Sequence, residues 1–287
     1  MTACPVCEST LLSGLRPWHL TCSACTYEGS SLEPHILAQA EGGDLDEGSR
    51  QDGLATLRQS NFARLLERLA ETATASDGGL PRLLDVGCAH GWFMEAASGR
   101  FSVVGIEPDR AVADATRARG LPVRGGFFPD VLDAGERFDI IVFNDVLEHI
   151  PDVNATLRAC HDHLMPGGWL VVNAPSRTGF LYRLSKVLVR SGLPRSFERM
   201  WQLGFPSPHV HYFDTGSIVC LGRRNRFELA STMSLPSMAV RGLFARIRYS
   251  RDVRVAKAAA LAAALTLARP LLAALPPDIK VWFLRKT

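Results

Sequence analysis

Hydrophobic residues in the middle of the chain fall into short runs that alternate with turns and amphipathic stretches. Residues 83–87 (LLDVG) form an apolar run with the length of a buried strand, and a tight turn separates it from residues 92–97 (WFMEAA), which suit a helix. A second apolar run, residues 103–106 (VVGI), comes next. This order of strand, turn, helix and strand predicts an α/β domain with a parallel sheet.

A further helix is predicted before the first strand. Apolar residues recur at spacings of three to five, with charged residues on the other side. These apolar residues are Leu57, Phe62, Leu65, Leu66 and Leu69. The acidic, glycine-containing segment that precedes them suits an exposed linker, so residues 41–79 are predicted to be a linker and a helix.

Composition and charge narrow the class of protein. The 287 residues are 47% hydrophobic and 21% charged, which excludes a disordered, collagen-like or disulfide-framework protein. The net charge of +3 and the pI near 8.5 do not by themselves require a nucleic-acid partner, and no DNA partner is expected. The first residues lack the pattern of a signal peptide, so we expect a cytoplasmic protein.

Two Cys-x-x-Cys pairs near the start of the chain, fourteen residues apart, predict a structural zinc site. The segment between the pairs has too little apolar mass to fold alone, and a metal would supply the missing stability. Residues 1–40 therefore resemble a zinc ribbon, with unmetallated turns or a redox dithiol as the alternative. His19 and His35 are interpreted as surface histidines. The four predicted ligands are Cys4, Cys7, Cys22 and Cys25.

The turn after residues 83–87 has features of a nucleoside site. Small residues at positions 87, 89 and 91 let the backbone come close to a bound molecule. Glu107 lies 22 residues after Asp85, at the end of the second apolar run, where a carboxylate accepts hydrogen bonds from both ribose hydroxyls. Dinucleotide enzymes also use a glycine turn and an acid, but this turn is one residue shorter than G-x-G-x-x-G.

Three segments together resemble the ubiquinone-biosynthesis-like branch of the class I S-adenosylmethionine-dependent methyltransferases. They are the turn at 87–91, residues 137–152 (RFDIIVFNDVLEHIPD) and residues 164–175 (LMPGGWLVVNAP). The resemblance implies a Rossmann-like, doubly wound, seven-stranded and mostly parallel sheet within residues 80–287. Residues 280–286 would form its antiparallel seventh strand. One departure is Ala89, where the family usually has a second glycine.

The resemblance also implies how S-adenosylmethionine would bind. The residues of the turn and Asp85 would form the methionine side, Glu107 would hold the ribose, and Asn144 would lie near the sulfonium. The adenine would lie near Pro108 and Phe127, although Phe127 equally suits the core. The implied cofactor-binding residues are Asp85, Gly87, Cys88, Gly91, Glu107, Pro108, Phe127 and Asn144.

Three histidines are candidate catalytic residues. An oxygen acceptor benefits from a general base, and His149 follows the fourth strand at the sheet edge where a base reaches the methyl group. Capping or packing is the alternative role for His149. His209 and His211 lie in a histidine-aromatic stretch that would orient or deprotonate the acceptor, or else are ordinary loop histidines. Some relatives hold a divalent metal near this motif, to which Glu148 and His149 would contribute.

Two basic, amphipathic insertions bear on the acceptor. Residues 176–210 and 237–278 interleave arginines with leucine and aromatic residues. The longest uncharged run, residues 258–268, is too short to cross a bilayer. The insertions are interpreted either as helices packed on the domain or as a peripheral surface at the inner face of a membrane.

The sequence therefore favours an S-adenosylmethionine-dependent methyltransferase with a structural Zn²⁺ site, acting on a small-molecule or lipid- or sugar-linked acceptor, with oxygen as the favoured acceptor atom. One alternative is an RNA methyltransferase, although residues 144–149 lack the proline- and aromatic-rich motif of base methylases. The other is a non-catalytic binding or scaffold protein that uses the ribbon to hold a partner.

Overall fold

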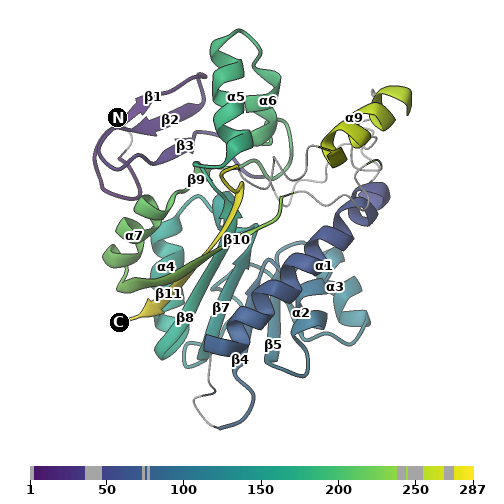
Figure 1. The fold of residues 1–287 in the computed structure, drawn as a ribbon. Helices are drawn as coiled ribbons and strands as arrows, with labels where there is room; N and C mark the ends of the chain where they lie inside the picture. Colours follow the sequence, from purple (N-terminus) through teal and green to yellow (C-terminus); the bar gives the residue numbers. More distant parts are fainter. Residues whose placement is uncertain are drawn as a thin grey trace.

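A computed structural model describes residues 3–35, 47–72, 75, 78–237, 244, 255–267 and 275–287. The chain forms a large sheet covered by helices on both faces and a small sheet beside it (Figure 1). Residues 41–46 of the predicted linker and most of the insertion at 237–278 lie outside the described residues, whereas residues 47–53, expected in the linker, belong to a helix (Glu47–Thr72).

The large sheet has seven strands in the order β10-β11-β8-β7-β4-β5-β6. Six strands run in the same direction, whereas β11 runs antiparallel between β8 and β10. The strand order reverses between β4 and β7, and ligands of open α/β sheets bind at such a switch point. The strands are β4 (Arg82–Val86), β5 (Ser102–Glu107), β6 (Val123–Gly125), β7 (Phe138–Asn144), β8 (Leu164–Pro175), β10 (Phe227–Leu235) and β11 (Ile279–Lys286). The predicted seven-stranded, mostly parallel fold, with its antiparallel final strand, is confirmed.

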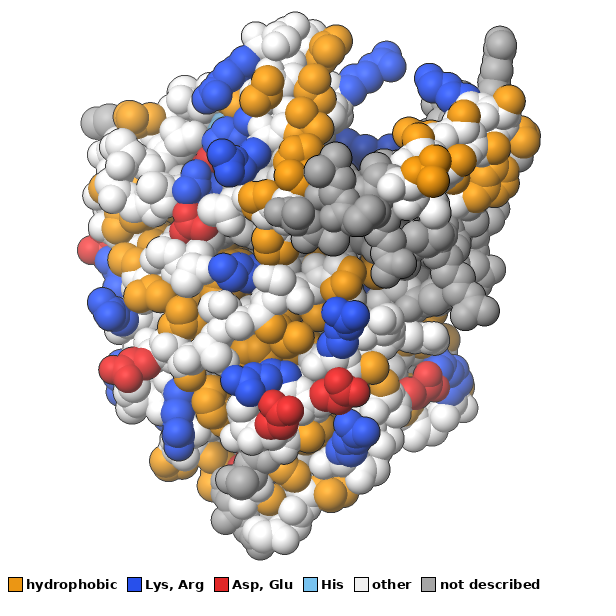
Figure 2. All heavy atoms as spheres, viewed as in Figure 1, with side chains coloured by type: hydrophobic (Ala, Val, Ile, Leu, Met, Phe, Trp, Pro, Cys, Tyr) orange, Lys and Arg blue, Asp and Glu red, His pale blue; other side chains and the backbone are white. Residues whose placement is uncertain are grey.

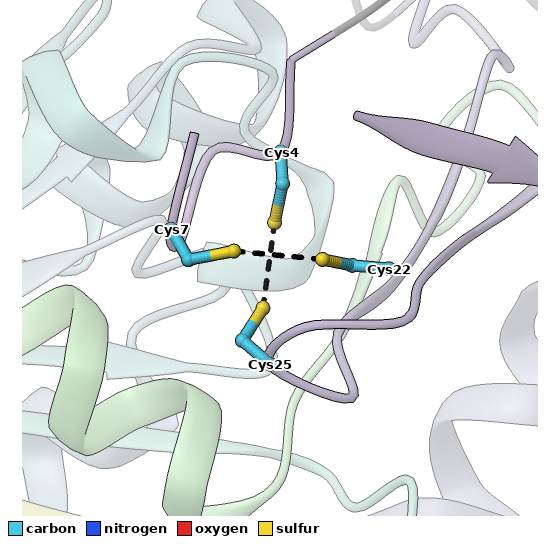
Figure 3. Close-up of side chains that lie close together, drawn as sticks. All are labelled: Cys4, Cys7, Cys22 and Cys25. Atoms are coloured by element: carbon cyan, nitrogen blue, oxygen red, sulfur yellow. Dashed lines mark hydrogen bonds between the residues drawn. The ribbon is translucent and has the colours of Figure 1, made fainter. Parts of the chain in front are cut away.

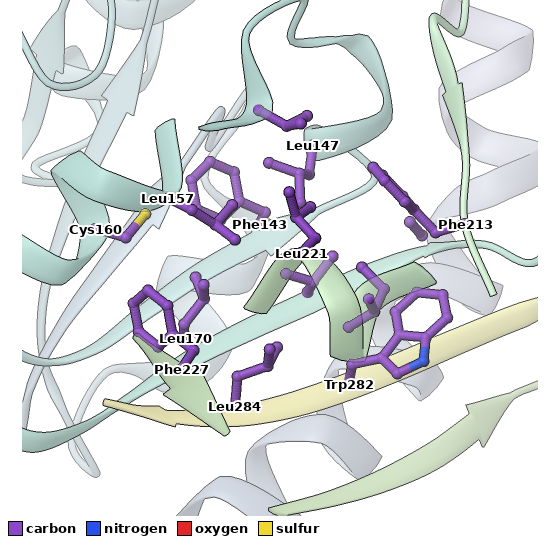
Figure 4. Close-up of a cluster of buried hydrophobic side chains, with 14 of the residues drawn as sticks. Phe143, Leu147, Leu157, Cys160, Leu170, Phe213, Leu221, Phe227, Trp282 and Leu284 are labelled. Atoms are coloured by element: carbon purple, nitrogen blue, oxygen red, sulfur yellow. The ribbon is translucent and has the colours of Figure 1, made fainter. Parts of the chain in front are cut away.

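Helices cover both faces because their apolar sides match the two faces of the sheet. On one face lie α1 (Glu47–Thr72) and α2 (Trp92–Ala97), followed in the chain by α3 (Arg110–Ala118). Leu57, Leu65, Leu66 and Leu69 of α1 are buried, as the spacing predicts. On the other face, α4 (Val153–His163) and α7 (Thr215–Arg224) pack against β7, β8 and β11 around Phe143, Leu170 and Trp282 (Figure 4).

The small sheet joins the N-terminal module to a distant segment of the chain. Strands β1 (Leu11–Ser13), β2 (His19–Cys22) and β3 (Glu28–Ser30) form an antiparallel sheet whose fourth strand is β9 (His211–Tyr212). The module therefore shares hydrogen bonds with the methyltransferase-like part, and Cys4, Val6 and Tyr27 belong to the same apolar cluster as the large sheet.

The interpretation of His19 as a surface residue is wrong. Its side chain is fully buried, with Nε2 3.1 Å from a carboxylate oxygen of Glu28 and Nδ1 accepting a hydrogen bond from the backbone N–H of Leu15. The aromatic residues Phe197 and Trp201, from a segment about 180 positions away, cover its ring, which a local sequence pattern does not reveal. His35 is exposed, as predicted.

Three further helices lie within the two predicted insertions. Helices α5 (Phe180–Arg190) and α6 (Arg195–Met200) stand above the carboxyl edge of the large sheet, next to the small sheet (Figure 1). Helix α9 (Val255–Leu267) belongs to the second insertion, whose basic segment at 245–254 lies outside the described residues. Among the described helices, none combines the length and hydropathy that a membrane span requires.

Candidate functional site

The turn after β4 contains two glycines, so its backbone lies at the carboxyl edge of the sheet without side chains at these positions. Gly87 and Gly91 both have φ of 72°, in the left-handed region that favours glycine. A Cβ at Gly87 would lie 2.6 Å from the side chain of Val146, and one at Gly91 would lie 2.5 Å from Leu121. Both glycines are therefore required by packing as well as by backbone conformation.

Glu107 at the end of β5 is fixed by two backbone groups. One carboxylate oxygen accepts from the backbone N–H of Ala89 and the other from that of Asp109, both at 2.9 Å. Burial raises the pKa of Glu107, and these two hydrogen bonds oppose the rise. The carboxylate thus bridges the turn after β4 and the start of α3, where a ribose would lie in a nucleoside site.

Asp85, Asn144 and Asn173 form a polar group at the ends of three adjacent strands. Burial, with a smaller contribution from Glu107, raises the pKa of Asp85 to about 7, against a lowering by the hydrogen bond from Asn144. The side-chain oxygens of Asn144 and Asn173 are buried and have no hydrogen-bond partner in the described part of the chain. Unpartnered buried polar atoms are costly, so a ligand that supplies donors would satisfy them.

The other predicted cofactor residues take different positions. The Cys88 side chain packs in the apolar cluster with Met94, Ala113 and Val123, so only its backbone faces the turn. Pro108 is half-buried, next to Glu107. Phe127 is 43% exposed, whereas its neighbour Phe128 packs edge-on against Phe143 in the core. Of the two phenylalanines, Phe127 is the one available to a ligand.

Glu148, His149 and His209 form a second cluster just beyond β7. One potential ligand atom from each lies within 4.8 Å of those of the other two. Both carboxylate oxygens of Glu148 and Nδ1 of His209 are buried without hydrogen-bond partners among the described residues. His149 lies on the 3₁₀ turn η1 (Leu147–His149), and its Nδ1 donates to the carbonyl of Pro208 at 3.0 Å in the neutral ring. The sequence anticipates Glu148 and His149 together, but the fold adds His209.

Burial dominates the electrostatics of this cluster. It raises the pKa of Glu148 well above its ordinary value, helped by the nearby Asp145, and lowers the pKa of His149. For His209, burial and the neighbouring His149 lower the pKa to about 3. All three side chains therefore favour their neutral forms near pH 7 unless a proton acceptor or a cation binds between them.

His211 lies apart from this cluster. Its Nε2 donates to the carbonyl of Ile150 at 2.8 Å, and its Nδ1 accepts a hydrogen bond from the hydroxyl of Tyr27. Burial lowers the pKa of His211 to about 4, so the ring is neutral and both nitrogens have partners. This arrangement favours a structural role for His211 over direct proton transfer.

The four predicted metal ligands converge at the N-terminal module. Their sulfur atoms all lie within 4.8 Å of one another, with 3.5 Å between Cys4 and Cys25 and between Cys7 and Cys22. Figure 3 shows the four sulfurs facing a common centre from two loops. Burial opposes ionisation of Cys7, but hydrogen bonds from Ser9 and the neighbouring sulfurs lower its pKa to about 6. Four thiols in this arrangement fit tetrahedral Zn²⁺.

Comparison with known proteins identifies the family of this chain. The profile of the family described as "Methyltransferase domain" matches residues 54–232, which is more than half of the chain. The chain belongs to the class I S-adenosylmethionine-dependent methyltransferases. The methyltransferase fold thus includes the turn after β4, Glu107 and the Glu148–His149–His209 cluster, which all fall inside the matched residues.

Curated relatives share the name ubiquinone biosynthesis O-methyltransferase. The one from Rhizobium etli is 36% identical over 104 residues, covering 34% of this chain and 42% of the relative. The one from Bradyrhizobium is 28% identical over 196 residues, covering 62% of this chain and 76% of the relative. The methyltransferase matches only about half the length of the first of these relatives.

Solved structures agree on the fold. A possible histamine N-methyltransferase from Thermotoga maritima has 16% identity and a TM-score of 0.53, covering 84% of this chain and 95% of its own. The cyclopropane synthase MmaA2 from Mycobacterium tuberculosis has 18% identity and a TM-score of 0.52, covering 89% and 90%. At these identities the likeness concerns the fold alone.

The structure adds residues that the sequence analysis missed. Asn173 interrupts an otherwise apolar strand, and this polar residue among valines is a signal that could have been read. Asp145 has φ of 55°, an unusual conformation next to the cluster. Gln202 places its side-chain nitrogen 2.9 Å from Nε2 of His209, a contact without a local sequence signal.

Proposed function

We propose that this methyltransferase transfers the methyl group of S-adenosylmethionine to a hydroxyl oxygen of a small-molecule or lipid- or sugar-linked acceptor. The observation that carries the proposal is the Glu148–His149–His209 cluster just beyond β7, in which both carboxylate oxygens of Glu148 and Nδ1 of His209 are buried without hydrogen-bond partners among the described residues. By the family resemblance, the sulfonium end of the cofactor lies at this same edge. The curated relatives named as O-methyltransferases support oxygen as the acceptor atom.

In this proposal His149 is the general base. Its Nδ1 donates to Pro208, so Nε2 of the neutral ring carries the lone pair that accepts the acceptor's proton. Its lowered pKa keeps the ring neutral and ready to accept a proton near pH 7. The sulfonium supplies most of the driving force, so the enzyme chiefly aligns the acceptor oxygen with the methyl group and excludes water.

The same cluster fits a divalent cation. Glu148 offers an unpartnered carboxylate and His209 an unpartnered Nδ1, which becomes a ligand if the Gln202 amide turns so that its oxygen accepts from Nε2. A cation there would favour the ionised form of Glu148 and lower the pKa of a nearby acceptor hydroxyl. Glu148 and His209 would hold it, because Nε2 of His149 serves as the base in this proposal while its Nδ1 donates to Pro208.

Zn²⁺ in the cysteine module is proposed as structural. Four thiols complete a tetrahedral shell, which leaves no open position for a substrate. The strands of the module have only three or four residues each, so the metal would supply much of its stability.

A peripheral membrane site is proposed on α5. Leu181, Leu184 and Val187 are 40–56% exposed and follow one another at helical spacing, and Leu193, just after the helix, is 60% exposed. Exposed arginines 183 and 190 lie on the same helix and arginines 195 and 199 on α6, and Figure 2 shows Lys and Arg side chains beside a hydrophobic stripe. An apolar stripe with a cationic margin matches an anionic lipid surface, and it would bring a lipid-linked acceptor to the carboxyl edge of the sheet. The proposed location is the inner face of a membrane, in the cytoplasm.

The experiment is to incubate the metal-loaded protein with methyl-labelled S-adenosylmethionine and a fractionated cell extract. The proposal predicts label in a small-molecule or lipid fraction, as an ether that resists mild base. It also predicts higher incorporation when Mg²⁺ or Mn²⁺ is added to protein that retains its zinc. Label confined to RNA, or none in any fraction, would contradict the proposal.

A further inference from the structure

We propose that the cysteine module positions the active-site histidines, and that Tyr27 and Ser30 are the positioning residues. The inference goes beyond the proposed function, because it assigns the module a role in shaping the acceptor side of the site. It rests on hydrogen bonds between residues 27–30 and the segment 206–214, which are independent of the identity of the acceptor.

The histidine segment relies on the module for its strand pairing. In the small sheet, β9 is an edge strand whose single neighbour among the described strands is β3, with Glu28 opposite Tyr212 and Gly29 opposite His211. A strand as short as β9 is not stable without such a partner.

Ser30 fixes the backbone of His209 and of the residue that follows it. Its hydroxyl donates to the carbonyl of His209 at 2.9 Å, and its backbone N–H donates to the carbonyl of Val210 at 3.0 Å. The backbone N–H of Val210 in turn donates to the carbonyl of Glu148 at 2.8 Å. Ser30 is thus one hydrogen bond away from His209 and two, through Val210, from Glu148.

Tyr27 selects the tautomer of His211. Because its hydroxyl donates to Nδ1, the proton of the neutral ring resides on Nε2, which then donates to the carbonyl of Ile150. Ile150 directly follows His149 and ends the η1 turn. A hydrogen-bonded chain therefore runs from the module through His211 to the turn that carries Glu148 and His149.

A buried charge group locks the module against α5 and α7. Glu28, 3% exposed, accepts hydrogen bonds from Tyr182 and Lys186 of α5 and from Arg177. Arg177 also pairs with Asp214, the N-cap of α7, at 2.7 Å. These contacts hold β3 in register with β9, so loosening of the module is transmitted to the histidines.

The test uses ¹⁵N-labelled histidine and NMR of the full-length, zinc-loaded protein, compared with Tyr27→Phe and Ser30→Ala. We expect Tyr27→Phe to change the Nδ1 and Nε2 shifts of His211, because its Nδ1 loses its donor. We expect both variants to shift the ring signals of His149 and His209. Ser13→Ala, on the far strand of the same module, is the matched control and should leave all three histidines unchanged. Unshifted His149 and His209 signals in both folded variants would overturn the proposal.

Zinc release provides the second arm. After chelation we expect the signals of His209 and His211 to broaden or shift, while S-adenosylmethionine affinity measured by calorimetry changes by less than about twofold. Unchanged histidine signals would overturn the proposal. Loss of cofactor affinity together with those signals would also overturn it, because the module would then support the whole fold. Absence of cofactor binding in the untreated protein would contradict the proposed function instead, and the histidine signals would still test the positioning role.

Discussion

The carboxylate of Glu107 accepts a hydrogen bond from the backbone N–H of Ala89, which joins the end of β5 to the turn after β4. The contact preorganises both loops of the proposed ribose site before any cofactor binds. The negative charge of the Glu107 carboxylate is the feature to which two ribose hydroxyls would donate hydrogen bonds.

Glu107→Gln is therefore expected to weaken cofactor binding. Removing the negative charge weakens charge-assisted hydrogen bonds by about 1.5–3 kcal/mol, which corresponds to a roughly 10- to 100-fold rise in the dissociation constant. Calorimetry with S-adenosylhomocysteine measures the effect. Glu95→Gln changes an exposed carboxylate on the neighbouring α2 and serves as the control, which should bind normally.

Asp85 predicts how cofactor affinity depends on pH. Its pKa of about 7 means that the carboxyl is mostly protonated below pH 7, whereas the cationic methionine end of the cofactor favours the ionised form. Affinity should therefore rise as pH increases through about 7, and fall by up to about tenfold per pH unit below it. Calorimetry in buffers of different ionisation enthalpy should detect proton release at pH 6.5. An equally strong pH dependence in Asp85→Asn would exclude Asp85 as its source.

His149→Gln should separate catalysis from cofactor binding. Loss of a general base lowers kcat by about 10²- to 10⁴-fold, with little change in S-adenosylmethionine affinity. The assay is label transfer with the active extract fraction. His163→Gln is the control variant. His163 forms a hydrogen bond with the carbonyl of Glu136 at the opposite end of the strands, away from the proposed site. Equal losses in both variants would indicate destabilisation instead of catalysis.

The stripe on α5 predicts binding to anionic vesicles. Leu184→Glu and Val187→Glu place a charge on exposed positions of the stripe, so each should lower the fraction that sediments with phosphatidylglycerol vesicles without lowering thermal stability. Vesicles of phosphatidylcholine alone should bind less protein. Leu12→Glu, at an exposed leucine of the cysteine module, is the matched control. Equal binding by all variants would show that α5 is not the contact.

Glu28 predicts an acid-sensitive contribution to stability. Burial alone would raise its pKa, but hydrogen bonds from His19, Lys186 and Tyr182 lower it to about 2, compared with 4.5 for a free glutamate. The stabilisation is therefore fully present above about pH 4.5 and is lost as pH falls toward 2. Glu28→Gln should cost about 3 kcal/mol at pH 7, because it leaves Lys186 without its carboxylate partner, whereas Arg177 keeps Asp214. Urea unfolding should show the difference from the unchanged protein narrowing toward pH 3.

The sequence predicted the features that depend on local spacing. The strand-turn-helix at residues 83–97, the buried leucines of α1 and the convergence of the four cysteines follow from periodicity and from fixed ligand spacing. The pairing of β9 with β3 joins residues more than 180 positions apart, and burial of His19 depends on aromatic residues equally far away. Such contacts are decided by tertiary packing and have no local sequence signal.

The most direct test of the account is a crystal structure of the protein with S-adenosylhomocysteine. The account predicts the ribose hydroxyls on the carboxylate of Glu107, the amino acid end beside Asp85 and the turn at Gly87, and the sulfur directed toward Asn144 and the His149 cluster. A product molecule bound elsewhere, or side chains filling the space between Glu107 and Asn144 in the presence of saturating product, would contradict it.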